Sequence, residues 1–160
     1  MSLTRNTGGL TMRAIGIGLL LSAGVAGAAS AAPFEAVDGT SRFLTMMDRS
    51  SLARSGAKVD ADFLLVSASG AAAITRFRFD CTARTWQQLS QRDIAEDLTL
   101  SAPVQMSEAP EAVPAGSLGV SMLERACFNR QANASAGWTT PTLAEAVRQG
   151  RAIMARKAKP

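Results

Sequence analysis

Two segments of the chain alternate apolar with polar residues, and this period of two predicts β-strands. Residues 58–67 place four apolar side chains on one side, namely Val59, Ala61, Phe63 and Leu65. Residues 74–81 do the same with Thr75, Phe77, Phe79 and Cys81. The opposite sides carry charged residues, so we expect a solvated face there. Ser69-Gly70 between the two segments predicts a hairpin turn, because glycine accepts positive φ.

Shorter runs suggest the rest of a sheet. Residues 42–47 are mostly apolar and predict a strand that ends in a turn at residues 48–51. Residues 82–89 are expected to continue strand 74–81 or to pair with it, and the charged stretch 91–97 to interrupt it. Residues 98–100 suit an edge strand or a loop. Prolines and a glycine within residues 101–116 predict a long irregular connection.

Two later segments have the spacing of helices. Ser117 is the expected N-cap of the first, its hydroxyl accepting from the backbone N–H groups of the first turn. One apolar stripe follows it, made of Leu118, Met122, Leu123, Ala126 and Cys127. Thr140-Pro141 predicts the start of a second helix, since proline suits the first turn. Its apolar side is marked by Leu143, Val147 and either Ile153 or Met154.

The first thirty or so residues have the three parts of a secretory signal peptide. Arg5 and Arg13 precede a run without charge, residues 14–25, and small residues follow at 26–32. The alternative, a retained membrane anchor, is disfavoured because about 20 apolar residues are needed to span a bilayer. We therefore expect cleavage after Ala31 and an exported protein, periplasmic, at the cell surface or secreted, without a transmembrane segment after cleavage.

Export predicts a disulfide between the only two cysteines of the sequence, because the compartment is oxidising. Closing the loop between Cys81 and Cys127 stabilises a folded chain by about 4 kcal/mol in the chain-entropy model. A redox or metal-binding pair requires close spacing or further ligands, which are absent from the sequence. The predicted fold class is α+β: a small antiparallel β-sheet with a helix packed on it, tied by the Cys81–Cys127 disulfide, plus a C-terminal helix.

These features divide the chain into four parts: a signal peptide at 1–31, a loose lead at 32–40, an α+β domain at 41–128, and a flexible linker with a basic C-terminal helix at 129–160. Of the 17 Lys and Arg residues, two leave with the signal, so 15 remain against 13 acids and the mature net charge is +2. This modest charge and the export signal disfavour nucleic-acid binding.

The order of several short motifs around the cysteines resembles the surface-adhesin protein E family of bacterial exported proteins. The motifs are Phe79-Asp80-Cys81, Arg84 with Gln88-Leu89-Ser90, Val113 to Leu118, Leu123 with Ala126-Cys127, and the Asp48 to Leu52 segment. The match spans roughly residues 40–128. The resemblance implies a small antiparallel sheet with a helix near the second cysteine, export, and, in some members, binding to host matrix proteins or plasminogen. It carries over no binding residue.

The sequence lacks histidine, so the usual general base of Ser and Cys hydrolases and the commonest metal ligand are both missing. No phosphate-binding or dinucleotide-binding motif is present. Two carboxylate groupings remain, Asp60 with Asp62 and Asp93 with Glu96 and Asp97. Their ordinary explanation is a solvated surface, although acid–base chemistry or a calcium site would use the same residues. We expect a protein that is not an enzyme and has no cofactor and no metal.

Two basic features are candidate binding surfaces. The first is formed by arginines on and near one strand face: Arg76, Arg78, Arg84 and Arg92. They would contact an anionic partner such as a glycan, a lipid headgroup or an acidic protein. A solvated strand face is the favoured explanation, because Asp80 shares that face. The second is the basic C-terminal helix, for which docking on its own domain or disorder is favoured over a membrane surface, because its apolar side is thin and mostly alanine.

Together these observations predict an exported, non-enzymatic binding module of the bacterial envelope that binds a protein or an anionic envelope partner. The alternative is a periplasmic accessory protein that modulates an envelope enzyme or complex. An enzyme that uses only carboxylates is a third reading.

Overall fold

The computed structural model describes residues 34–130 and 138–158, so the predicted signal peptide and most of the predicted linker lie outside the described residues. The elements in chain order are β1 (Phe34–Gly39), β2 (Phe43–Ser55), β3 (Lys58–Ser67), β4 (Ala72–Asp80), β5 (Thr85–Ile94), β6 (Val104–Gln105), β7 (Glu111–Ala112), α1 (Leu118–Phe128), β8 (Thr139–Thr140) and α2 (Leu143–Lys157).

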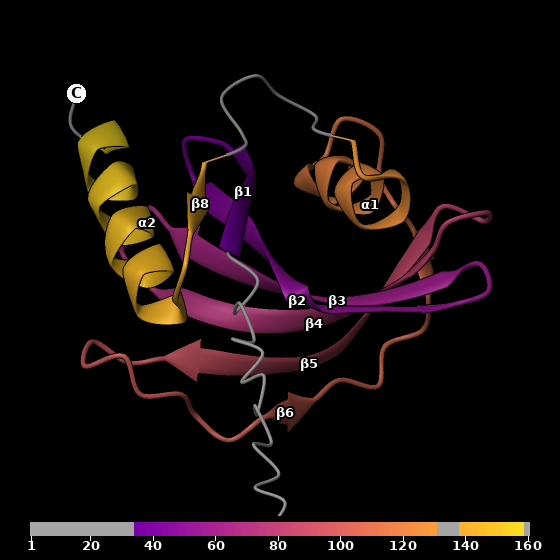
Figure 1. The fold of residues 1–160 in the computed structure, drawn as a ribbon, viewed down its shortest axis with the longest axis horizontal. Helices are drawn as coiled ribbons and strands as arrows, with labels where there is room; N and C mark the ends of the chain where they lie inside the picture. The colour runs from indigo at the N-terminus through magenta and orange to yellow at the C-terminus, as the bar shows by residue number, and fades with distance from the viewer. Residues whose placement is uncertain (1–33, 131–137, 159–160) are drawn as a thin grey trace, which may run out of the picture.

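One curved antiparallel sheet forms the centre of the molecule (Figure 1). Its strand order is β6-β5-β4-β3-β2-β1-β8, and β7 pairs with β5 beside this path. The first five strands are neighbours in space in the order in which they occur in the chain, because short turns connect them. Gly70 occupies the β3–β4 turn with φ of +85°, as the Ser69-Gly70 pair predicts. The register across that turn pairs Phe63 with Thr75.

The helices lie near opposite ends of the sheet (Figure 1) and cover opposite faces of it. Side chains of successive strand residues point to opposite faces. Helix α1 packs on odd-numbered residues of β3 and β4, with Phe63, Phe77 and Phe79 at the centre of its core. Helix α2 packs on even-numbered residues such as Leu64 and Val66. Each helix therefore covers only one half of the sheet face on which it packs.

The core beneath α1 is dense and aromatic. Phe63 meets Phe77 and Phe79 edge to face, with ring centroids 6.1 and 5.9 Å apart. Trp86 stacks on Phe77 at 5.2 Å. These rings contact the apolar stripe of α1, whose buried members include Met122 and Leu123, as the helical spacing predicts.

The predicted fold class is confirmed. Cys81 follows β4 directly and forms a disulfide with Cys127 in the last turn of α1, with the two Cα atoms 5.6 Å apart. The bond therefore joins the sheet to the helix that covers it. Cys127 is buried within the α1 core, where the alternation of residues 74–81 places the sulfur of Cys81.

The expectation of a loose lead at 32–40 is wrong for its described part. Residues 34–39 form β1, which pairs with β2 and β8. Phe34, Ala36 and Val37 are all buried. The segment is a strand between two others, and its residues contribute to both cores.

The predicted turn at residues 48–51 is also wrong, since β2 continues to Ser55. The register jumps from Asp48 opposite Asp62 to Ala53 opposite Asp60. Residues 49–52 thus bulge out of β2 opposite a single residue of β3. The polar composition of this segment marks a bulge here, because a bulge leaves backbone groups without ladder partners and polar side chains can bond them.

Three further expectations differ from the structure. Residues 91–94 are not a break, because they belong to β5, where the bridge of Ala72 with Ile94 completes the pairing with β4. Ser117 is the N-cap of α1, yet its hydroxyl donates to the Pro114 carbonyl instead of accepting from the helix. The expected domain end at 128 is too early, because α2 packs on β2 and β3 over buried Val147 and Met154, so the C-terminal helix docks on its own domain, as one of the favoured alternatives has it.

Candidate binding surfaces on the sheet

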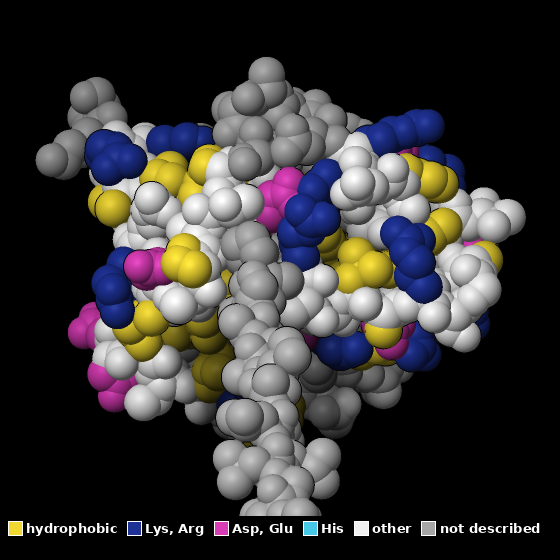
Figure 2. Space-filling model, in the orientation of Figure 1, with side chains coloured by type: hydrophobic (Ala, Val, Ile, Leu, Met, Phe, Trp, Pro, Cys, Tyr) yellow, Lys and Arg dark blue, Asp and Glu magenta, His cyan; other side chains and the backbone are white. Residues whose placement is uncertain are grey.

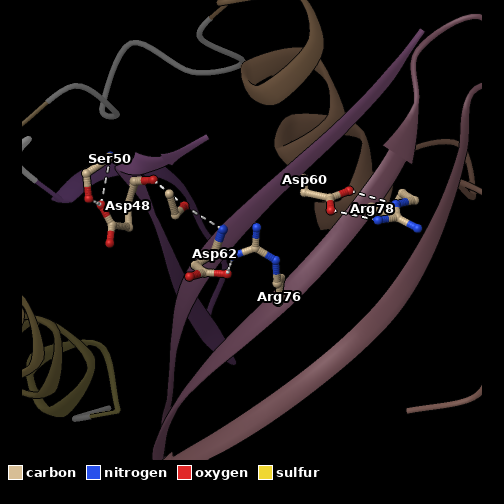
Figure 3. A network of polar contacts seen from close by, with 7 residues as sticks. Asp48, Ser50, Asp60, Asp62, Arg76 and Arg78 are labelled. Atoms are coloured by element: carbon tan, nitrogen blue, oxygen red, sulfur yellow. Dashed lines mark hydrogen bonds and ion pairs between the residues drawn. The ribbon is translucent and has the colours of Figure 1, made fainter. Parts of the chain in front are cut away.

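The uncovered half of the face that carries α2 is polar. It holds the charged ladder, which we define as Asp48, Asp60, Asp62, Arg76 and Arg78. Pairs from β3 and β4 lie directly opposite each other in register (Figure 3). Arg78 makes a bidentate contact with Asp60 at 2.7 and 2.8 Å, and Arg76 donates to Asp62 at 3.0 Å.

Serine side chains in the β2 bulge form hydrogen bonds with residues of the charged ladder. The hydroxyl of Ser51 donates to the backbone carbonyl of Asp48 at 2.6 Å and accepts from the backbone N–H of Asp62 at 2.7 Å. One side chain thus replaces the ladder bonds that the bulge interrupts. The Asp48 carboxylate accepts from the backbone N–H and hydroxyl of Ser50 (Figure 3).

The two Asp–Arg pairs of the charged ladder differ in the direction in which the pKa of the aspartate is shifted. The hydrogen bond from Arg78 lowers the pKa of Asp60 below its ordinary value. Burial raises the pKa of Asp62, and this outweighs the opposing effect of Arg76. Arg78 is still 43% exposed, so water screens its pair with Asp60 and the pair stabilises the fold by about 1 kcal/mol or less.

These opposite shifts predict a difference between Asp60→Asn and Asp62→Asn. A lowered folded-state pKa means that the Asp60 contribution is present at neutral pH and lost as pH falls through that pKa. Asp62 has a raised pKa, so its charged form opposes folding above that pKa. In urea unfolding at pH 7, Asp60→Asn is therefore expected to cost more stability than Asp62→Asn. The cost of Asp60→Asn should shrink progressively as pH falls below 3.8, the ordinary pKa of an aspartate, and a cost that does not change in that range would contradict the assignment.

The predicted arginine surface is spread over different places. Arg76, Arg78 and Arg92 share the face of the charged ladder, whereas Arg84 lies beyond the end of β4 and pairs with Glu124 of α1 at 2.9 Å. Arg92 donates to the carbonyl of Ser101. Figure 2 shows basic side chains dispersed among acidic and neutral ones on the face it draws. The four arginines thus contact carboxylates or a carbonyl and do not form one joint patch.

The uncovered half of the opposite face, beyond the end of α1, is a groove. We call it the Phe43 groove, and its cavity volume is about 270 Å³. Its lining residues come from β2 to β5 and the β3–β4 turn, namely Phe43, Leu65, Ser67, Ala71, Ala72, Ala73, Thr75, Gln91 and Asp93. Phe43 is 41% exposed, one of three large apolar side chains that are exposed among the described residues. A large exposed apolar side chain beside a hollow is typical of a binding surface.

The sequence pattern predicts only part of this groove. The run 42–47 predicts a strand, but nothing in it shows that Phe43 stays exposed while Leu44 is buried under α2. The run Ala71-Ala72-Ala73 is the signal that reasoning from sequence missed. Ala73 gives the sheet a low floor on the face of the groove, where larger side chains stand elsewhere, whereas the side chain of Ala72 belongs to the core beneath α2.

A buried ion pair between β1 and α1 was also missed. Arg125 donates to the Glu35 carboxylate, and both side chains are nearly inaccessible, at 7% and 5%. Arg49 from the bulge stands 3.7 Å from the same carboxylate. Arg125 also donates to the carbonyl of Asn129, the C-cap of α1. These contacts are structural, since they hold the first strand, the bulge and the helix together.

The described residues form neither a metal site nor a membrane-spanning helix. Within 34–130 and 138–158, no three His, Cys, Asp or Glu side chains gather to hold a metal ion. No helix in these ranges is long and apolar enough to cross a membrane.

Comparison with protein-family models, curated proteins and solved structures finds no match to this chain. The resemblance to surface-adhesin protein E thus rests on the motifs alone.

Proposed function

We propose that this protein is an exported, non-enzymatic binding module of the bacterial envelope that engages another protein through the Phe43 groove. Export is inferred from the signal-like first 31 residues and agrees with a disulfide, which persists in oxidising compartments. The observation that carries the proposal is that α1 leaves half of its sheet face uncovered, with exposed Phe43 at the border of the hollow.

The composition of the groove supports a protein partner. Apolar Phe43 and Leu65 lie beside polar Gln91 and Asp93. Protein interfaces combine an apolar centre with a polar rim in this way. The groove's volume of about 270 Å³ lies below the usual range of small-molecule pockets, about 300–1,000 Å³. It suits one or two side chains of a partner.

The ladder supports the absence of catalysis. A general acid must hold its proton near neutral pH. Asp60 is instead kept charged by Arg78, which lowers its pKa. Asp62, whose pKa is raised, is tied to Arg76 and receives its backbone bond from Ser51. These are contacts that order a strand surface.

The test is capture with a matched pair of variants. Mature protein, residues 32–160, is immobilised and exposed separately to envelope extract and to purified matrix proteins. Phe43→Ser removes the exposed ring of the groove, whereas Val104→Ser removes an apolar side chain that is 59% exposed on β6, outside the groove. We expect one partner to bind wild type and Val104→Ser and to be lost with Phe43→Ser.

Exposure to envelope extract and exposure to matrix proteins distinguish the two kinds of binding module. A matrix protein as the captured partner would indicate an adhesin, and an envelope protein would indicate a periplasmic accessory protein. Equal capture by all three forms would place the contact outside the groove and refute the proposal, as would the finding that the mature chain stays in the cytoplasm on cell fractionation.

A further inference from the structure

We infer that the Phe43 groove selects a segment of the partner that carries an apolar side chain next to a lysine or arginine. This inference rests on the proposed function and adds the chemistry of the partner. It differs from the expectation of an anionic partner, which was based on the arginines of the other face.

The floor of the groove accepts an apolar side chain because small residues form it. In register, Thr45, Leu65, Ala73 and Asp93 lie across the four strands β2 to β5. Beneath α1, the same face carries phenylalanines, and the helix fills the space above them. Beyond α1, the β4 residue on this face is Ala73, and the space above it is open. Burying the exposed part of an apolar ring against this floor stabilises a complex.

The polar end of the groove is acidic. Among the described residues that line it, Asp93 is the only ionisable one. A row of hydrogen bonds along β5 holds its carboxylate in place: Gln88 donates to Gln91 at 3.2 Å, and Gln91 donates to Asp93 at 3.0 Å. An amide that donates to a carboxylate fixes its position without neutralising its charge. The groove therefore presents one oriented negative charge, which favours a cation beside the apolar contact.

The charged ladder is the internal control. It lies on the opposite face of the sheet, and its carboxylates already face arginines in the same chain, as Asp60 does Arg78. A cationic segment gains less there, because the guanidinium groups repel it. Asp60→Asn thus removes a carboxylate from the ladder and leaves the groove unchanged.

The test is selection of peptides from a random display library on the immobilised mature protein. We expect enriched sequences to share an apolar residue adjacent to Lys or Arg. The affinity of an enriched synthetic peptide should fall about tenfold on Phe43→Ser. Changing its Lys or Arg to Glu should weaken binding about threefold to fivefold. Asp93→Asn should remove that preference, and Asp60→Asn should preserve it. Circular dichroism melts verify that each variant folds.

Several outcomes would overturn the inference: enriched sequences that are acidic, binding that is equal for Phe43→Ser, or no enrichment over uncoated support. A dimer in sedimentation that dissociates on Phe43→Ser would assign the groove to a second copy of the chain and overturn it too. The two proposals fail separately. If the selected peptides are acidic but a partner is captured through Phe43, the proposed function stands and the inferred preference is wrong. If the selected peptides are apolar and basic but no partner is captured, the preference of the groove stands and the proposed function is refuted.

Discussion

Replacing both cysteines by alanine is expected to lower the free energy of unfolding by about 4 kcal/mol. The bond between Cys81 and Cys127 closes a loop with a sequence separation of 46 residues. Without it the unfolded chain gains conformational freedom, whereas the aromatic core beneath α1 keeps its contacts. This loss is a large share of the stability of about 5–15 kcal/mol that is typical of a domain. Equilibrium unfolding in urea measures it directly.

The control for this prediction is the wild-type protein unfolded with and without a reductant. Reduced wild type and the double alanine variant should have similar midpoints, because both lack the constraint on the unfolded chain. A loss below about 1 kcal/mol would contradict the prediction. It would mean that the unfolded chain already keeps the two cysteines close together.

Arg125→Met is expected to destabilise the protein by about 3–5 kcal/mol, because it leaves the buried Glu35 carboxylate without its closest cation. Arg49 lies 3.7 Å from the same carboxylate and is 48% exposed, so this contact is screened by water and compensates only weakly. The variant also loses the bond from Arg125 to the carbonyl of Asn129 at the end of α1. Thermal and urea unfolding of the single variant measure the effect.

The double variant Glu35→Leu with Arg125→Met is the control for this effect. It removes both charges and should be more stable than Arg125→Met alone, because the buried carboxylate is removed together with its closest cation. Arg49→Ala should cost less than about 1 kcal/mol, since its pair is exposed on one side. If the single and double variants unfold at the same urea concentration, the cost comes from lost packing and not from the buried charge.

The sequence predicts the strands and helices whose patterns are regular. Residues 58–67 alternate strictly at first and form β3 with those bounds. The expectation of one solvated face fails at their end, where Leu64 and Val66 are buried beneath α2. A local pattern shows which residues share a face. It does not show that a helix far along the chain will cover the second face.

Elements whose contacts are distant in the sequence cannot be predicted from a short window of residues. β1 reads as a loose lead because its buried residues contact β2 and α1, which no short window contains. The buried charge of Glu35 is explained only by Arg125, 90 positions later. The arginines of β4 are visible in the sequence, but their pairing with Asp60 and Asp62 depends on the strand register. The groove likewise depends on where α1 ends above the sheet.

The claim that the Phe43 groove binds a partner protein is tested most directly by photo-crosslinking in living cells. Benzoylphenylalanine is placed at position 43 and, as the matched exposed control, at position 104 on β6. We expect ultraviolet light to give a discrete adduct with a second protein from position 43 and none from position 104. The same adducts from both positions, or none from position 43, would contradict it.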